Sequence, residues 1–165
     1  MQKPLKTYES LWYTLPNNLG VVEFTADVLE YFSRYQQKCV KAKEAGGQLF
    51  WKLAAQGHRQ LVLVTGPRKC DKRTRTSYKS DWRAEQREID KLYKKELHWL
   101  GDWHTHPEPI PKPSRVDIQT IKEVYSKTKN RGTGILMVVV GTKDFPEGLS
   151  VSWCDGRVQT LEPRT

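Results

Sequence analysis

Two histidines separated by one residue, His104 and His106, lie in a segment that reads Gly-Asp-Trp-His-Thr-His-Pro. Successive side chains of an extended strand alternate sides, so both imidazoles would lie on one face and reach the same ion. A run of alternating prolines then leads to Ser114 and Asp117, and this stiff connector can bring the carboxylate back to the two rings. Two histidines and one carboxylate, with a fourth position left for water, form a ligand set of catalytic zinc.

Ser114 and Asp117 also have a simpler explanation. Ser-x-x-Asp ahead of an apolar run predicts a helix capping box, in which the serine accepts from the backbone and the aspartate reaches back to the cap. A lone histidine is more often a structural residue than a ligand. Here, however, the residue types match metal chemistry at every position, and the capping and metal interpretations can both hold.

Hydrolysis at such a centre also requires a proton carrier. Zinc lowers the pKa of bound water from about 16 to about 7, and a neighbouring carboxylate can take its proton and return it to a leaving amine. We predict Glu44 for this role, because Gly46 and Gly47 follow it and allow close backbone approach. The Ser114 hydroxyl would donate to the developing oxyanion. Asp102 shares the strand face of the histidines, where it either orients an imidazole or is an ordinary surface carboxylate.

These residues resemble the signature of the JAMM (MPN-plus) metalloproteases. That signature is His-x-His, usually followed by proline, with serine ten and aspartate thirteen residues after the first histidine; here 114 − 104 = 10 and 117 − 104 = 13. The family's upstream Glu-x-Gly-Gly-x-Leu is matched from Glu44 to Leu49. The resemblance covers about residues 20–155. It implies a mixed sheet flanked by helices, of the cytidine-deaminase-like JAMM/MPN architecture, and one Zn²⁺ per chain.

The sequence is most similar to short bacterial JAMM proteins, with which it shares the segments Gly46–Phe50, Arg73–Ser77 and Gly101–Pro107. Such proteins occur in CBASS anti-phage operons beside an E1/E2-like conjugating enzyme. The resemblance implies an isopeptidase that removes a ubiquitin-like modifier or cleaves after its C-terminal glycine or small residue. It would thereby reverse conjugation, for example of a cGAS-like nucleotidyltransferase. Trp51, Asp102 and Trp103 depart from the eukaryotic pattern, which leaves the substrate's shape open.

Composition agrees with one compact enzyme domain over residues 1–165, with a core at about 20–155. The chain has 37% hydrophobic residues and six tryptophans, which is too rich for disorder. No apolar run reaches the roughly 18 residues of a membrane span, and residues 1–20 lack the pattern of a signal peptide. We therefore expect a cytoplasmic protein. Three cysteines without CxxC spacing indicate neither disulfides nor a thiolate zinc site.

The hydrophobic pattern predicts the elements that must hold the motifs, and the fold class is mixed α/β. Helices are expected over 26–37 with Thr25 as cap, after Asp81 and after Ser114. Strands are expected over 21–24, 47–53, 60–65, 100–106, 135–140 and 149–153, with a turn at 56–58. The strand over 100–106 would present the two histidines.

A net charge of +9 raises an alternative in which the protein binds nucleic acid or another polyanion. The basic residues cluster in one loop, which contains Arg68, Lys69, Lys72, Arg73, Arg75 and Lys79. Charge runs are usually solvated, but loops also carry recognition groups, so Arg73 and Arg75 are candidates for a substrate-binding wall.

The substrate tail itself is expected against a strand edge near 47–51, with Gly47, Gln48 and Leu49 as binding candidates. Alternatives to an isopeptidase are a catalytically silent MPN scaffold, a nucleic-acid protein such as the RadC-like relatives, and a small-molecule hydrolase. We expect no membrane partner, and the sequence favours an isopeptidase over a nucleic-acid-binding protein.

Overall fold

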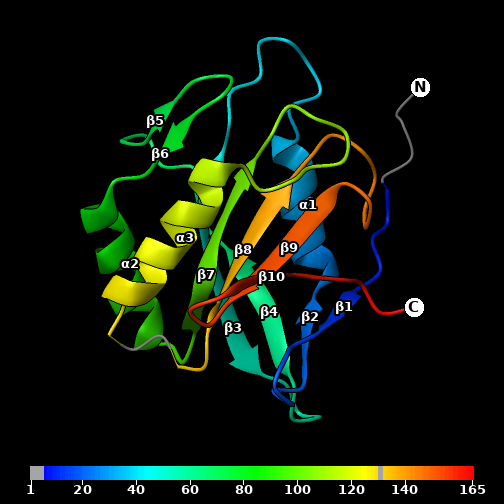
Figure 1. Cartoon of the computed structure of the whole chain (residues 1–165), viewed down its shortest axis with the longest axis vertical. Coiled ribbons are helices and arrows are strands. Elements are labelled where there is room, and N and C mark those ends of the chain that lie inside the picture. The colour runs from blue at the N-terminus through cyan, green and yellow to red at the C-terminus, as the bar shows by residue number, and fades with distance from the viewer. Residues whose placement is uncertain (1–5, 130–131) are drawn as a thin grey trace.

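The structure is a computed structural model that describes residues 6–129 and 132–165. Within these residues, eight strands form one mixed sheet in the order β1-β2-β4-β3-β7-β8-β9-β10, and β5 and β6 form a separate hairpin. Helix α1 covers one face of the sheet, and α2 and α3 cover the other (Figure 1). The expected mixed α/β architecture, a sheet flanked by helices, is confirmed.

The bounds of the elements follow the hydrophobic pattern closely. The strands of the sheet are β1 Leu11–Thr14, β2 Val21–Phe24, β3 Gly46–Leu53, β4 Arg59–Val64, β7 His98–Thr105, β8 Ile135–Val140, β9 Leu149–Cys154 and β10 Val158–Leu161. The hairpin is β5 Lys72–Arg73 and β6 Tyr78–Lys79, and the helices are α1 Ala26–Tyr35, α2 Trp82–Tyr93 and α3 Arg115–Lys127. None of these helices has the length and apolar character of a membrane span.

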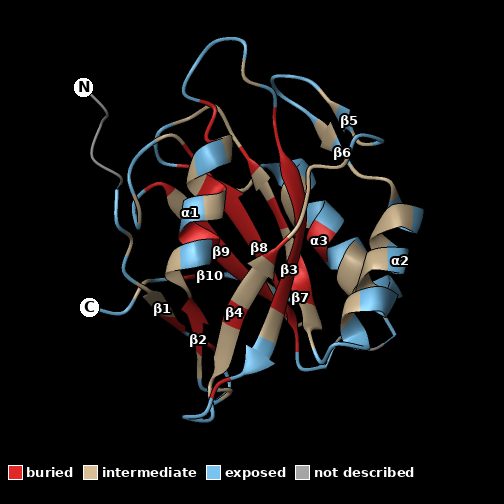
Figure 2. Cartoon of the chain, turned by 180° about the vertical axis from the view of Figure 1, so that it is seen from behind, coloured by how far each residue is buried: buried red, intermediate tan, exposed pale blue. Residues whose placement is uncertain are grey.

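Strand β8, in the centre of the sheet, is apolar on both faces. All six residues of β8 are buried, as expected for a strand between two layers of helices. Its even-numbered residues join the main core, to which α1 contributes Val28, Leu29 and Phe32. Ile135 and Met137 instead pack with Ile121 of α3 in a second cluster. Figure 2 shows the buried strands beneath α1.

A bulge in β7 decides which face receives the histidines. The pairing with β3 shifts register next to Leu49, which pairs with Gly101. Gly101 has a φ of +151°, and a Cβ there would collide with the carbonyl oxygen of Leu136. Beyond the bulge, Trp103 packs in the α1 core, while Asp102 and His104 line a cavity toward α3. The strict alternation expected for residues 102–106 therefore holds because the irregularity precedes them.

The hydrophobic core also draws on residues outside the range of about 20–155 to which the family resemblance was assigned. β1 and β10 lie outside it, and Tyr13, Leu15 and Leu161 are buried in the main core. Both strands have four residues and sit at the edges of the sheet, where a short segment shows little alternation. The first helix also ends two residues early, at Tyr35. Thr25 occupies its N-cap position without a side-chain cap, because its hydroxyl donates to the Leu61 carbonyl.

The expectation of a free strand edge near 47–51 is wrong. β3 lies between β4 and β7 and is hydrogen-bonded to both. Leu49 and Gln48 are 0% and 2% exposed, so neither is available to a substrate at this position. Gly47 lines the cavity, but a Cβ at this residue would collide with the Thr65 carbonyl. Packing therefore explains why residue 47 is a glycine, without a substrate.

Candidate metal centre

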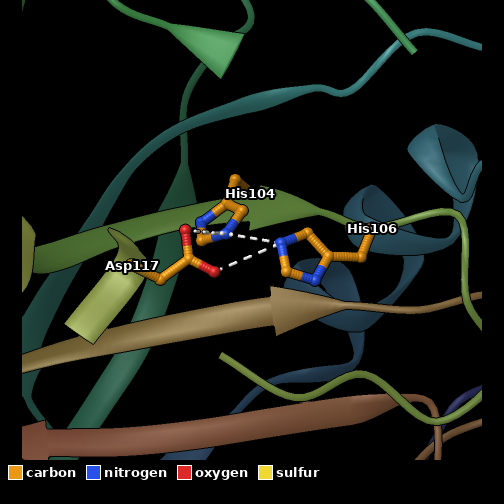
Figure 3. Close-up of side chains that lie close together, drawn as sticks. All are labelled: His104, His106 and Asp117. Atoms are coloured by element: carbon orange, nitrogen blue, oxygen red, sulfur yellow. Dashed lines mark hydrogen bonds and ion pairs between the residues drawn. The ribbon is translucent and has the colours of Figure 1, made fainter. Parts of the chain in front are cut away.

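The two imidazoles and Asp117 meet where β7 ends and α3 begins. His104 pairs in the sheet with Gly46 on one side and Val139 on the other, which fixes its side chain on the α3 face. His106 follows the end of β7, and its backbone N–H donates to the Val140 carbonyl. Figure 3 shows the Asp117 carboxylate facing both rings.

The three side chains converge on one point. His104 Nε2 lies 3.2 Å from His106 Nε2. Asp117 Oδ1 lies 3.2 Å from His104 Nε2, and its Oδ2 lies 3.2 Å from His106 Nε2. Ligands bound to zinc at about 2.0 Å in a tetrahedron are about 3.3 Å apart, so these donor atoms fit a zinc ion. Among the described residues, His104, His106 and Asp117 are the histidine, cysteine or acidic side chains whose ligand atoms lie close enough together to hold one metal ion.

The first turn of α3 positions Asp117. Ser114 is the N-cap, and its Oγ accepts from the Asp117 backbone N–H at 3.0 Å. In return the Ser114 backbone N–H donates to Asp117 Oδ2 at 2.7 Å. The predicted capping box is thus present, and the same carboxylate faces the imidazoles. The capping interaction holds the carboxylate in place and leaves its remaining lone pairs toward the histidines.

Electrostatics at this point favour a cation. Burial opposes ionisation of Asp117, but hydrogen bonds from His104 and His106 outweigh it and hold the pKa of the carboxyl well below its usual range. Burial likewise disfavours a charged His106, yet the Asp117 and Glu108 carboxylates raise its pKa to about 9. A divalent cation bound here would take the place of the protons on the histidines and would be stabilised by the same carboxylates.

Glu44 lies beside the three donor atoms. It leads into β3, where its neighbour Ala45 exchanges hydrogen bonds with Thr105 at the end of β7. Glu44 is 6% exposed and lines the same cavity of about 930 Å³ as His104, His106 and Asp117. Burial raises its pKa, although the charges of the two histidines act against this. A carboxylate of raised pKa next to a metal position can accept and return a proton.

The arginines expected to form a substrate wall contact the main chain instead. Arg73 Nε donates to the Glu44 carbonyl at 2.6 Å, and Arg75 Nη1 donates to the carbonyls of Cys39 and Val40 at 3.0 and 2.9 Å. These bonds hold the loop that carries Glu44. They account for both arginines without a substrate, so direct substrate contact stays a prediction.

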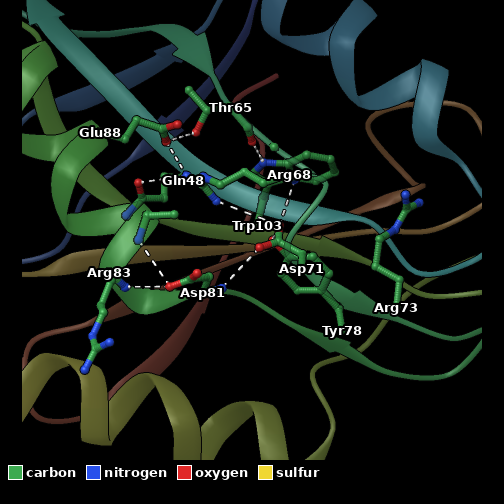
Figure 4. A network of polar contacts seen from close by, with 12 residues as sticks. Gln48, Thr65, Arg68, Asp71, Arg73, Tyr78, Asp81, Arg83, Glu88 and Trp103 are labelled. Atoms are coloured by element: carbon green, nitrogen blue, oxygen red, sulfur yellow. Dashed lines mark hydrogen bonds and ion pairs between the residues drawn. The ribbon is translucent and has the colours of Figure 1, made fainter.

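Arg68 is also engaged within the fold. Its guanidinium pairs with Glu88 of α2 and donates to Gln48 Oε1 at 3.2 Å (Figure 4). Asp71 in the same network accepts from the Arg68 backbone and from the Tyr78 hydroxyl. The basic loop therefore presents mainly lysines to solvent.

The carboxylate that contacts an imidazole beside Asp117 is Glu108 and not Asp102. Asp102 lines the cavity, but in the described residues no hydrogen bond joins it to an imidazole. Burial, with the charge of Glu85, raises its pKa to about 8. Glu108 instead approaches His106, with Oε1 3.0 Å from Nδ1. Its position two residues after the second histidine is visible in the sequence, but the contact depends on how the chain turns after β7.

Comparison with known proteins agrees with this geometry. Residues 25–154, most of the chain, match the family described as prokaryotic homologs of the JAB domain. The chain belongs to this family. A solved protein from Desulfitobacterium hafniense is similar to this JAB-domain chain with a TM-score of 0.56 and 17% identity, over 83% of this chain and 87% of the other. At that identity the likeness concerns the fold alone.

Two curated relatives carry a functional name. A "CD-NTase/cGAS isopeptidase" of Escherichia coli (strain TW11681) is 29% identical over 75% of this JAB-domain chain and 78% of its own length. A protein of the same name from Pseudomonas aeruginosa (strain BWHPSA011 / Pa011) is 27% identical over 74% and 79%. The resemblance inferred from the sequence motifs is confirmed at the level of the family.

Proposed function

We propose that this JAB-domain chain is a zinc-dependent isopeptidase that releases a conjugated protein from the lysine to which it is joined. The observation that carries the proposal is the convergence of His104, His106 and Asp117 beside the buried Glu44 in one cavity. Zinc held by these three residues would lower the pKa of water and polarise the amide carbonyl. The names of the two curated relatives support the same class of reaction.

Glu44 supplies the proton transfers. Its carboxylate takes a proton from the attacking water and returns it to the leaving lysine amine. Burial raises its pKa toward the working pH, which improves the match between its proton affinity and both steps. The Arg73 hydrogen bond to the Glu44 carbonyl and the pairing of Ala45 with Thr105 fix its backbone, so the carboxylate needs little reorganisation.

Ser114 stabilises the oxyanion. Its Oγ accepts from the Asp117 backbone, which leaves the hydroxyl proton free to point elsewhere. The residue is exposed and lines the cavity, so this proton can be donated to the oxygen of a carbonyl under attack. Such a donor contributes about 3 kcal/mol in comparable sites.

The substrate tail is expected along β6 rather than β3. Within the described residues, β6 pairs with β5 alone, so its second edge is open. Ser77, Tyr78 and Lys79 line the cavity opposite α3, so this edge borders the metal position. An extended tail that adds to β6 would present its last peptide bonds to Glu44 and Ser114.

The partner is a protein conjugated through its C-terminus. A cGAS-like CD-NTase, as in the relatives' names, is the first substrate to test, and a ubiquitin-like modifier is the chemically equivalent one. An E1/E2-like enzyme that makes the conjugate would be the functional counterpart in an anti-phage system.

The test uses a CD-NTase whose C-terminal carboxyl is joined to lysine Nζ of a reporter peptide. Zinc-loaded wild type is expected to restore the free carboxyl and the free lysine, as read by mass spectrometry, and Asp117→Ala is expected to leave the conjugate intact. A short lysine isopeptide without the folded protein serves as the matched control for a small-molecule hydrolase. If zinc-loaded wild type cleaves neither substrate, the proposal is wrong.

A further inference from the structure

The proposed reaction gives no role to Glu108, whose carboxylate contacts a candidate ligand. Glu108 follows His106 and Pro107 at the start of the proline connector, and its side chain is 46% exposed. Its Oε1 lies 3.0 Å from His106 Nδ1 and accepts from the Lys112 backbone N–H at 3.1 Å. One oxygen therefore joins a histidine at the end of β7 to the far end of the connector.

The contact with His106 sets which ring nitrogen faces the metal position. Nε2 of His106 points at His104 and Asp117, so a ligand role requires Nε2 to be free of hydrogen and Nδ1 to carry it. A carboxylate that accepts from Nδ1–H fixes this tautomer and restrains the ring. It also makes the Nε2 lone pair a stronger ligand for a metal ion. In the described residues, the Nδ1 of His104 has no such carboxylate.

The contact with Lys112 organises the path to the third ligand. It closes the turn over residues 108–112, from which Pro113 leads to Ser114 at the start of α3. Because Asp117 is held by the cap of that helix, the placement of the turn decides where its carboxylate lies. The Glu108 side chain thus ties the strand that carries His106 to the segment that delivers Asp117.

The backbone of Glu108 is itself anchored to the sheet. Its carbonyl accepts from Thr142 at 2.9 Å, just beyond the end of β8. Gly141 has no room for a Cβ, which would collide with the carbonyl oxygens of Glu108 and Pro109. Gln36, at the end of α1, donates to the Gly141 carbonyl at 2.9 Å. This support fixes the backbone from which the Glu108 carboxylate reaches His106 and Lys112.

We propose that Glu108 is a positioning residue of the metal centre, which orients His106 and locks the connector so that zinc is bound tightly and released slowly. The inference rests on the zinc site of the proposed function and not on its substrate. Removing a carboxylate in this relation to a ligating histidine typically weakens metal affinity by about 10- to 100-fold.

The experiment compares wild type, Glu108→Ala, Glu108→Gln and Glu30→Ala. Glu30 is the matched control, because it is 49% exposed, is ion-paired with Arg34 on α1 and lies away from the site. Zinc affinity is measured by competition with a chromogenic chelator, and zinc release by adding the chelator in excess. The melting temperature of each metal-free protein reports on the fold separately.

Glu108→Ala is expected to bind zinc about 10- to 100-fold more weakly and to release it correspondingly faster. Glu108→Gln should lose less, because its amide oxygen can still accept from His106 and Lys112 without the charge, and Glu30→Ala should match wild type. Affinity of Glu108→Ala and Glu108→Gln within about twofold of wild type would overturn the proposal. Tight zinc binding without cleavage of any conjugate would instead overturn the proposed substrate and leave this test decisive.

Discussion

Two histidine–carboxylate clusters of this protein have similar burial and opposite designs. In the first, Glu23 of β2 accepts from His58 Nε2 at 2.8 Å, from Ser10 at 2.7 Å and from Gln60 at 3.0 Å. The His58 ring also packs on Trp12, with centroids 4.7 Å apart. His58 and Gln60 contact Oε2 of the carboxylate and Ser10 contacts Oε1, so both oxygens are satisfied without a ligand.

In the second cluster, the donor atoms point at one another. Two imidazole nitrogens and the Asp117 oxygens lie 3.2 Å apart around a common point. A histidine next to a carboxylate is therefore not a metal site by itself. Convergence of three donor atoms, with a buried carboxylate such as Glu44 left over beside them, distinguishes the centre that can bind an ion.

The strongest test of this contrast removes one carboxylate from each cluster. Asp117→Ala is expected to lose zinc and activity together, because two imidazoles alone leave the ion incompletely ligated. Glu23→Ala is expected to keep about one zinc per chain, since its cluster contributes no ligand. Elemental analysis of both purified variants decides between them. Near-stoichiometric zinc in Asp117→Ala would mean that Asp117 is not a required ligand and serves only the helix cap.

Glu44→Gln tests the carboxylate that is left over. The variant keeps the shape of the side chain and all three ligands, so zinc content should match wild type. Loss of the proton carrier should lower kcat by about 10²–10⁴ on the CD-NTase–lysine conjugate. Zinc content and kcat are measured on the same sample. If kcat stays within about tenfold of wild type, a different group carries the proton.

The convergence of His104, His106 and Asp117 could be predicted from the sequence because the constraints on these residues are local. Alternation places His104 and His106 on one face, and the capping motif at Ser114 places Asp117 at the start of a helix. The bulge at Gly101 did not disturb this, since it precedes the relevant residues. The positions of the two buried β8 faces and of α3 follow from equally local hydrophobic patterns.

The errors concern properties that depend on strand order and loop closure. Nothing local distinguishes β3 as an inner strand, because its neighbours β4 and β7 are fixed by long-range pairing. The bonds from Arg73 and Arg75 to a distant loop, and the turn that brings Glu108 back to His106, likewise depend on tertiary structure. Local patterns could therefore place the three candidate ligands and the Ser114 cap, but not the contacts made by Arg73, Arg75 and Glu108.

Glu23→Gln tests the cluster that needs no metal. The substitution removes the charge that receives hydrogen bonds from His58, Ser10 and Gln60 in a nearly buried position. We expect the free energy of unfolding to fall by about 1–3 kcal/mol, as measured by denaturant titration at neutral pH. Zinc content and kcat should stay at the wild-type values. A fall in zinc content would mean that the two clusters are coupled through the sheet.

The smallest expected effect is a separation of two acid transitions. Burial opposes the charge of Glu23, but hydrogen bonds from His58, Ser10 and Gln60 outweigh it and lower its pKa below the ordinary carboxyl value of 4.5. The contribution of Glu23 to the stability of the fold is therefore complete above pH 4.5, and it is lost as the pH falls through the lowered pKa. Burial raises the pKa of Glu44, so its base form is lost while the pH is still above 4.5. Activity should therefore fall at a higher pH than the Glu23 contribution to stability.

The measurement is kcat/KM against pH at saturating zinc, beside the difference in unfolding free energy between wild type and Glu23→Gln. Zinc content is followed in the same samples, because protonation of the histidines also releases the ion. A half-maximal rate above pH 4.5 with zinc still bound assigns the acid limb to Glu44, and Glu44→Gln should show no such limb in its residual rate. A half-maximal rate at or below pH 4.5 would contradict a buried base. The cluster around Asp117 would then differ from the cluster around Glu23 only in its ability to bind a metal.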